Sequence, residues 1–138
     1  MLIHETQLRV QYYETDQMGV VHHSNYIRYF EIGRTELMRN IGLTYKEVED
    51  SGTVMPIAAV EVRYFFPARY DEILTIKTTI KEMPKARMVV YYEIFNEQGK
   101  LLADGNTTLA FVNKETGRPQ RAPDAMNAVL SRYLAETI

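Results

Sequence analysis

The stretch "NYIRYFEIGRTELMRN" (residues 25–40) decides the fold, because it predicts a helix too apolar for a surface position. Its first half carries apolar side chains on several sides of the helix, which is typical of a buried helix: Tyr26, Ile27, Tyr29, Phe30 and Ile32. At about 1.5 Å per residue the helix is roughly 24 Å long, enough to cross a β-sheet. Gly33 costs about 1 kcal/mol of helix propensity relative to alanine, so we expect close packing against another backbone there.

Signals on either side of this stretch set its limits. Ser24 is a preferred N-cap residue, and Gly42 lies where a left-handed residue ends a helix. A short second helix is predicted next, because Thr44 and Glu47 have the spacing of a capping box and Gly52 closes the segment.

The remaining sequence alternates with a period of two, which predicts strands. In the first segment Leu8, Val10 and Tyr12 share one face, and "NEQG" (96–99) predicts a hairpin between the last two segments. A final helix is expected from Pro123 or Asp124 onward. The predicted strand segments are "TQLRVQYY" (6–13), "IAAVEVRYFF" (57–66), "EILTIKTTIKE" (72–82), "RMVVYYEIF" (87–95) and "LLADGNTTLAFV" (101–112).

The order of a strand, a long buried helix and then four consecutive antiparallel strands predicts an α+β fold with the helix laid on a curled sheet. Nothing resembling a linker or a repeat interrupts the chain, so residues 1–138 are expected to form one domain. Strands that are apolar on both faces have more surface to bury than one helix covers. We therefore expect a homo-oligomer, either a dimer or a tetramer.

Composition excludes several classes of function. The net charge of −2 gives no electrostatic footprint for nucleic acid. The absence of cysteine excludes disulfides, thiolate nucleophiles and cysteine-bound zinc. No apolar run reaches the length of a membrane span, and the first residues, "MLIHETQLRV", lack the pattern of a signal peptide. These features predict a cytoplasmic protein without an integral membrane segment.

The polar segment "DQMGVVHHSNY" (16–26) joins the first strand to the helix and admits more than one interpretation. Asp16 and Gly19 match the first and fourth positions of a type I turn. His22 and His23 are adjacent and point in different directions, so a shared metal is disfavoured and bonds to the helix entry are the better interpretation. Ser24 lacks the surroundings of a nucleophilic serine, which favours its role as an N-cap.

Together, these residues also suit chemistry. A buried helix that begins at Ser24 presents unpaired backbone N–H groups and a partial positive charge, which can hold the oxygen of a polarised carbonyl. The carboxylate of Asp16 precedes that helix end and could attack a carbonyl or activate water. The segment therefore predicts acyl transfer to water.

The segment "RVQYYETDQMGVVHHSNY" (9–26) resembles the signature of the 4-hydroxybenzoyl-CoA thioesterase family of hotdog-fold proteins, particularly its YbgC-like acyl-CoA thioesterases. "EIGRTE" (31–36) and "VEVRYFFPARYDEILTIKT" (60–78) also look like family stretches, so the resemblance spans most of the chain. The positions that meet the family pattern are Arg9, Val10, Thr15, Asp16, Gly19, Val20, Val21, His23 and Tyr26.

This resemblance implies a hotdog fold, in which a curved antiparallel sheet wraps a long central helix, and active sites at the interface of a dimer. It implies that Asp16 is the catalytic nucleophile or general base and that the N–H of His23 polarises the thioester carbonyl. The side chain of His23 would orient the substrate or water. Aromatic-specific relatives carry an aromatic residue at this position, which argues against 4-hydroxybenzoyl-CoA itself. The residues expected to contact the substrate are Tyr13, Gly19, Val20, His22 and Tyr26.

The resemblance also implies an acyl-CoA substrate and no separate cofactor. Lys85 and Arg87 in "PKAR" fall where family members bind the nucleotide end of CoA, although a solvated basic loop would show the same charge pattern. The leading hypothesis is hydrolysis of a short-chain or aromatic acyl-CoA. The alternatives are a non-catalytic protein that binds acyl-CoA or an acyl carrier protein, and a hotdog dehydratase, which would need an H-x-x-x-x-P-G loop that this chain lacks.

Overall fold

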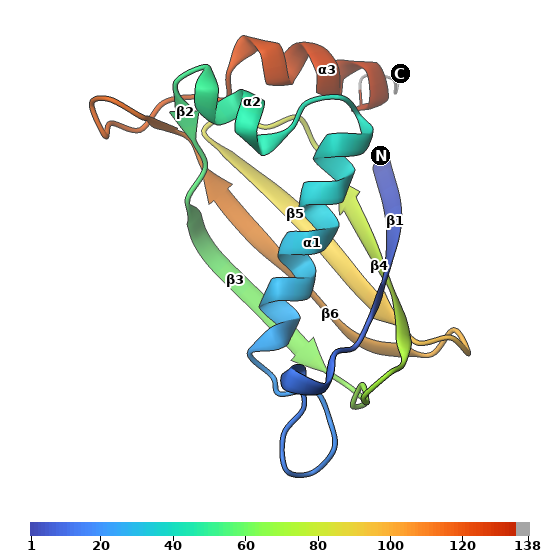
Figure 1. The fold of residues 1–138 in the computed structure, drawn as a ribbon. Helices are drawn as coiled ribbons and strands as arrows, with labels where there is room; N and C mark the ends of the chain where they lie inside the picture. The colour runs from blue at the N-terminus through green and yellow to red at the C-terminus, as the bar shows by residue number, and fades with distance from the viewer. Residues whose placement is uncertain (135–138) are drawn as a thin grey trace.

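The computed structural model describes residues 1–134 and shows an antiparallel sheet with a long helix lying across one face (Figure 1). The helix is α1 (Asn25–Asn40), which matches the predicted limits. The strands of the sheet run in the order β1-β4-β5-β6-β3, and each neighbouring pair is antiparallel. They are β1 (Leu2–Arg9), β3 (Ile57–Tyr64), β4 (Ile73–Ile80), β5 (Arg87–Phe95) and β6 (Leu101–Ala110). The structure therefore confirms the α+β class and the hotdog arrangement.

The contact between α1 and the sheet explains why residue 33 is glycine. Along β4, Leu74, Ile76 and Thr78 are fully buried beneath the helix. A Cβ atom at Gly33 would overlap Thr78 Oγ1 and lie 2.9 Å from Ile76 Cγ2. Only a residue without a side chain allows this approach, so close packing at Gly33 is confirmed, although the atoms that it faces are side-chain atoms of β4 and not another backbone as expected.

The order of the strands could not be deduced from their order along the chain. β3 pairs with β6 and not with β4, so it forms an edge of the sheet. Its apolar side chains are exposed on the single chain, including Ile57 at 43%, Val60 at 42% and Tyr64 at 50%. A long apolar edge strand with a free hydrogen-bonding side is the surface through which a second chain can add to a sheet.

The first strand ends earlier than expected. β1 stops at Arg9, and Tyr12–Glu14 form a single turn of 3₁₀ helix, η1, so the prediction that Tyr12 shares the buried face of Leu8 and Val10 was wrong. The side chain of Tyr12 is 76% exposed. The chain leaves the sheet because Glu14 Oε1 accepts the N–H of Gln11 (2.8 Å), which closes the turn.

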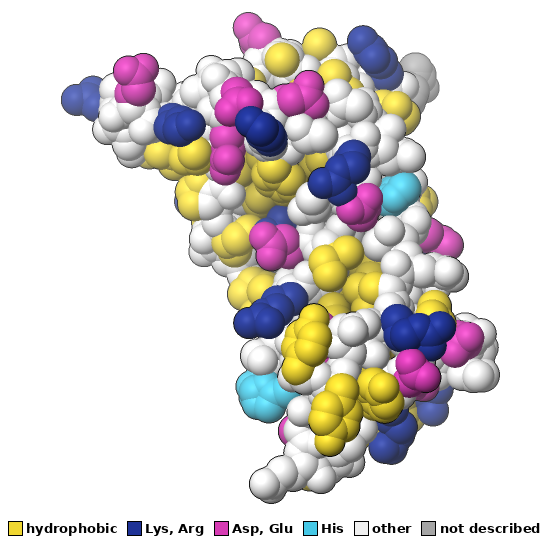
Figure 2. All heavy atoms as spheres, in the orientation of Figure 1, with side chains coloured by type: hydrophobic (Ala, Val, Ile, Leu, Met, Phe, Trp, Pro, Cys, Tyr) yellow, Lys and Arg dark blue, Asp and Glu magenta, His cyan; other side chains and the backbone are white. Residues whose placement is uncertain are grey.

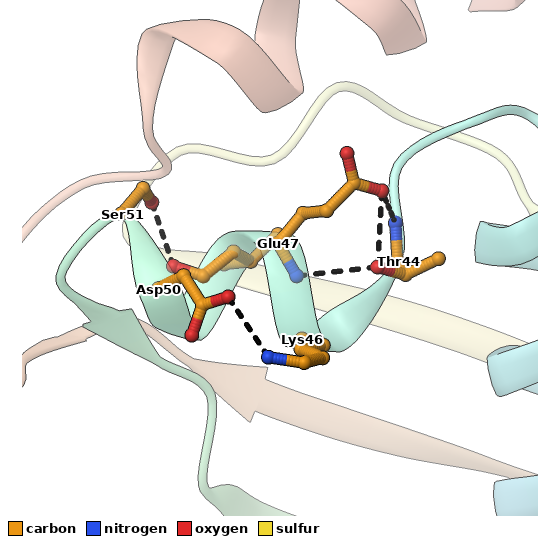
Figure 3. Close-up of polar contacts among 6 residues, drawn as sticks. Thr44, Lys46, Glu47, Asp50 and Ser51 are labelled. Atoms are coloured by element: carbon orange, nitrogen blue, oxygen red, sulfur yellow. Dashed lines mark hydrogen bonds and ion pairs between the residues drawn. The ribbon is translucent and has the colours of Figure 1, made fainter.

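Helix α2 (Tyr45–Asp50) follows α1 and begins with the predicted capping box (Figure 3). The N–H of Glu47 donates to Thr44 Oγ1 (3.2 Å), and the carboxylate of Glu47 accepts the N–H of Thr44 (3.0 Å). Gly42 before the box (φ +82°) and Gly52 after the helix (φ +107°) take the left-handed conformation that ends a helix.

The remaining elements lie at the end of the molecule opposite to the start of α1 (Figure 1). They are α3 (Asp124–Leu134) and the short paired strands β2 (Thr53–Val54) and β7 (Val112–Asn113). The last helix begins at Asp124, as predicted. Within residues 1–134, no helix combines the length and the apolar character that crossing a membrane requires.

Candidate active site

Asp16 leads a tight turn, as the sequence suggested. Its Oδ1 accepts the N–H of Met18 (2.8 Å) and its carbonyl accepts the N–H of Gly19 (3.0 Å). Gly19 takes φ +78°, which favours glycine. The turn uses mainly one carboxylate oxygen of Asp16, because Oδ2 has no hydrogen-bond partner among the described residues. The turn therefore leaves one carboxylate oxygen of Asp16 without a partner among the described residues.

The backbone N–H groups at the start of α1 are almost all occupied. The N–H of His22 donates to the carbonyl of Glu14 (2.8 Å), and that of Ser24 donates to His22 Nδ1 (3.3 Å). The N–H groups of Asn25 and Tyr26 donate to the carbonyls of His22 (3.0 Å) and His23 (3.2 Å). Among residues 22–26, only the N–H of His23 has no acceptor in the described part of the chain. This group is therefore free to hold an oxygen from a ligand.

Ser24 is the residue before α1, but its side chain does not cap the helix, which corrects the prediction. Its backbone is already helical (φ −62°, ψ −22°), and its hydroxyl lies 2.8 Å from His22 Nδ1. His22 takes over part of the capping by accepting the N–H of Ser24. The expectation that a histidine bonds the helix entry is thus confirmed for His22.

Asp16 and His23 line the same hollow, which has a volume of about 320 Å³. Apolar and aromatic side chains provide the other walls, and Figure 2 shows apolar side chains gathered over the part of the molecule where α1 begins. The remaining lining residues are Val21, Tyr26, Tyr64, Phe65, Phe66 and Pro67. Asp16, His23 and apolar walls are thus brought together around one space.

Tyr64, at the end of β3, fixes one wall of this hollow and was missed in the sequence. Its hydroxyl donates to the carbonyl of His23 (3.3 Å), and its ring packs edge-on against Tyr26 with centroids 5.1 Å apart. The hydroxyl of Tyr26 accepts the N–H of Ala68 (3.3 Å), and burial raises the pKa of Tyr26, so this phenol stays protonated. The available sequence signal was the aromatic run 64–66, which Pro67 ends.

Four other residues expected to contact the substrate are not among those that line this hollow: Tyr13, Gly19, Val20 and His22. Tyr13 is 77% exposed and lines a separate hollow on the other side of Asp16. The ring of His22 lies against that of His23, with centroids 4.3 Å apart, and is exposed. Val20 forms a backbone bridge to Arg69, which fastens the turn to the segment that follows β3.

Lys85 and Arg87 do not meet Asp16 within one chain. Lys85 lies between β4 and β5, and Arg87 is the first residue of β5, at the opposite end of the sheet (Figure 1). The carbonyl of Lys85 accepts the N–H of Ala122 just before α3. A different cation is nearer: Lys100 Nζ lies 3.5 Å from the ring centroid of Phe66. Lys100 lines a hollow that adjoins the site and shares Tyr64, Phe65 and Phe66 with it.

Metal coordination finds no support in this part of the molecule. Within residues 1–134, no three histidine, aspartate or glutamate side chains come together in a group that could hold a metal ion.

Comparison with known proteins points to one family. Residues 10–130 match the thioesterase-like superfamily. The chain is 33% identical to YneP of Bacillus subtilis over 119 residues, which cover 86% of each protein. It is 31% identical over 131 residues to the acyl-CoA thioesterase YbgC of Helicobacter pylori, covering 89% of this chain and 96% of YbgC. A solved structure of DHNA-CoA thioesterase from Staphylococcus aureus superposes with a TM-score of 0.84 at 34% identity, covering 96% of this chain and 84% of that chain.

Proposed function

The chain belongs to the thioesterase-like superfamily, and we propose that it hydrolyses the thioester of a short-chain or aromatic acyl-CoA to the free acid and CoA. One observation carries the proposal: Asp16 and His23 line the same hollow, and among the described residues the N–H of His23 has no acceptor and Oδ2 of Asp16 has no hydrogen-bond partner. The names of the relatives agree with this chemistry.

In the proposed reaction, the thioester carbonyl oxygen accepts a hydrogen bond from the N–H of His23, which stabilises the negative charge of the tetrahedral intermediate. Asp16 then acts in one of two ways. As a nucleophile, its free oxygen bonds to the acyl carbon and the C–S bond breaks, which releases CoA thiolate and leaves a mixed anhydride for water to hydrolyse. As a general base, Asp16 takes a proton from the water that attacks the acyl carbon; the C–S bond then breaks, and the departing CoA thiolate takes up that proton. The imidazole of His23 orients the substrate or this water.

The test is thiol release from short, long and aromatic acyl-CoA substrates, measured for the wild type and for Asp16→Asn. Asparagine keeps an oxygen for the N–H groups of the turn but can neither act as an effective base nor form the anhydride. We expect turnover to fall by at least about 10³-fold, as for other single residues essential to the chemistry. Undiminished turnover would overturn the role of Asp16, and tight acyl-CoA binding without thiol release would favour the non-catalytic binding protein.

The size and lining of the hollow support the substrate class. A volume of about 320 Å³ is at the small end of ligand sites, which suits a compact acyl group, and its aromatic walls suit an apolar one. We expect kcat/KM to be highest for short or aromatic acyl groups and to fall for long chains. An acyl carrier protein that presents the same thioester would reach the same hollow, so acyl-carrier substrates belong in the panel.

We further propose that the chain works as a homo-oligomer joined through β3. If the β3 strands of two copies pair antiparallel about a two-fold axis, the end of one β3 at Ile57 lies beside the end of the other at Tyr64, which lines the hollow. This arrangement would bring Lys85 and Arg87 of one copy toward the active site of its partner, where they could bind the phosphates of CoA. Sedimentation at micromolar concentration is expected to give a dimer or tetramer, and a monomer would contradict the proposal. Lys85→Gln should then raise KM for acyl-CoA more than kcat changes.

A further inference from the structure

Glu14 is a buried carboxylate between β1 and the Asp16 turn, and no step of the proposed chemistry uses it. Its side chain lies in an apolar setting with 9% of its surface exposed. A carboxylate in such a place requires hydrogen-bond partners. Glu14 Oε1 has two, because it accepts the N–H of Gln11 (2.8 Å) and the hydroxyl of Tyr29 on α1 (2.9 Å). The side chain therefore ties the η1 turn to the body of the helix.

The backbone carbonyl of Glu14 makes a second pair of contacts with the helix entry. It accepts the N–H of His22 (2.8 Å) and the side-chain amide of Asn25 (3.0 Å), which is only 6% exposed. Glu14 precedes Asp16 by two residues, and His22 directly precedes His23. One residue is thus bonded to both of the segments that carry the reacting groups.

We propose that Glu14, Tyr29 and Asn25 are positioning residues that fix the separation between the Asp16 carboxylate and the His23 N–H. The kinetic consequence rests on the proposed function. An error of about 1 Å in the placement of reacting groups can cost about 10²-fold in rate, even when its cause lies away from the chemistry. Removing these bonds should therefore lower kcat, whereas KM should change little because the walls of the hollow remain.

The chain offers a matched control in Tyr92. Tyr29 and Tyr92 are both fully buried between α1 and the sheet, with 0% and 1% exposure, and each hydroxyl has one side-chain partner. The hydroxyl of Tyr92 pairs with Thr107 Oγ1 (2.6 Å), which has no bond to the Asp16 turn. Tyr29→Phe and Tyr92→Phe each delete one buried hydroxyl, so both should lower Tm, and the loss should be larger in Tyr29→Phe because its partner is a carboxylate.

Steady-state kinetics of the two variants test the proposal. Tyr29→Phe is expected to lower kcat by about 10- to 100-fold at nearly constant KM, and Tyr92→Phe to leave kcat within about twofold of the wild type. Glu14→Gln keeps a carbonyl oxygen for Gln11 and Tyr29, so it should retain more activity than Glu14→Ala. Equal losses of kcat in Tyr29→Phe and Tyr92→Phe would overturn the proposal, because both would then reflect stability alone.

Amide hydrogen exchange provides a readout that does not need activity. The N–H groups of Gln11 and His22 both bond to Glu14, so their exchange should accelerate in Tyr29→Phe and not in Tyr92→Phe. Unchanged exchange in Tyr29→Phe would overturn the positioning role, even in an active enzyme. Accelerated exchange in a protein that hydrolyses no thioester would instead support the positioning of the turn and refute the proposed function.

Discussion

The starts of α1 and α2 show two ways to begin a helix. At α2 the side chains of Thr44 and Glu47 satisfy each other's backbone N–H groups, and a solvent-exposed helix start is thereby completed by its own sequence (Figure 3). At α1 the hydroxyl of Ser24 turns toward His22, and the N–H of His23 is left without an acceptor beneath a hollow that Asp16 also lines. A saturated helix start stabilises the fold, whereas an unsaturated one is available to a ligand.

The contrast shows what the residue type at an N-cap can and cannot indicate. Ser24 and Thr44 are both favoured N-cap residues, and both helices begin where these residues predict. The difference lies in the partners. Thr44 is followed three residues later by Glu47, which completes the capping box. Ser24 comes two residues after His22, and the ring of His22 pairs with its hydroxyl.

Of the changes that test this comparison of the two helix starts, the largest effect is expected from removing the N–H that α1 leaves free. His23→Pro deletes this N–H, and kcat should fall by about 10²- to 10³-fold, the usual cost of losing an oxyanion donor. His23→Ala keeps the N–H and should lose less. Ser24→Pro is the neighbouring control, since φ −62° suits proline and its N–H already has an acceptor. The measurements are kcat and KM, with circular dichroism to check that each variant is folded. A wild-type kcat in His23→Pro would show that the free N–H at the start of α1 has no role in catalysis.

Thr44→Ala should have the opposite profile. It removes the acceptor of the Glu47 N–H, so the free energy of unfolding should fall by about 1 kcal/mol while kcat stays unchanged. Urea unfolding and thiol release measure the two quantities. A loss of activity without a loss of stability would mean that α2, too, serves the active site.

The α2 capping box should also respond to acid. Hydrogen bonds from the N–H and hydroxyl of Thr44 lower the pKa of the Glu47 carboxyl below its ordinary value of 4.5. Because the folded pKa is the lower one, the stabilisation is complete above about pH 4.5 and is lost as pH falls through the folded pKa. Unfolding free energies from neutral pH down to about pH 3 should therefore fall less steeply for Glu47→Gln than for the wild type. Parallel curves would show that the box is not coupled to this carboxyl.

The smallest effect is expected for Ser24→Ala. Replacing an N-cap serine usually costs about 1 kcal/mol, but the Ser24 hydroxyl accepts no helix N–H, so the free energy of unfolding should change by less than about 0.5 kcal/mol. Urea unfolding alongside Thr44→Ala gives the comparison directly. Equal losses in the two variants would show that Ser24 caps α1 in solution after all.

Features that depend on neighbours in sequence were predictable. The limits of α1, the α2 capping box and the left-handed glycine at Gly42 follow local rules, and all three were predicted and confirmed. The edge position of β3 was not predictable, because alternation shows that a segment is a strand but not which strand it joins. An apolar strand has the same sequence pattern at the centre and at the edge of a sheet.

The candidate site divides along the same line. Asp16 and His23 belong to one continuous motif, which is why the sequence pointed to both, although their catalytic roles remain predictions. The aromatic wall at Tyr64 comes from a strand 41 residues later than His23, and the partner of Glu14 on α1 comes 15 residues later in the chain. These contacts form only when the helix packs on the sheet, so no residue spacing in the sequence predicts them.

The glycine in the middle of α1 has a consequence for the reacting end of the same helix. Gly33 allows the close approach of α1 to β4, and the start of the helix at Asn25 lies a little more than two turns away along a stiff rod. An alanine at residue 33 would have to lift this rod from Thr78, and the tilt would reach the amide of His23. We therefore expect the position of the His23 amide to depend on atoms in the interior of the sheet that lie outside the hollow.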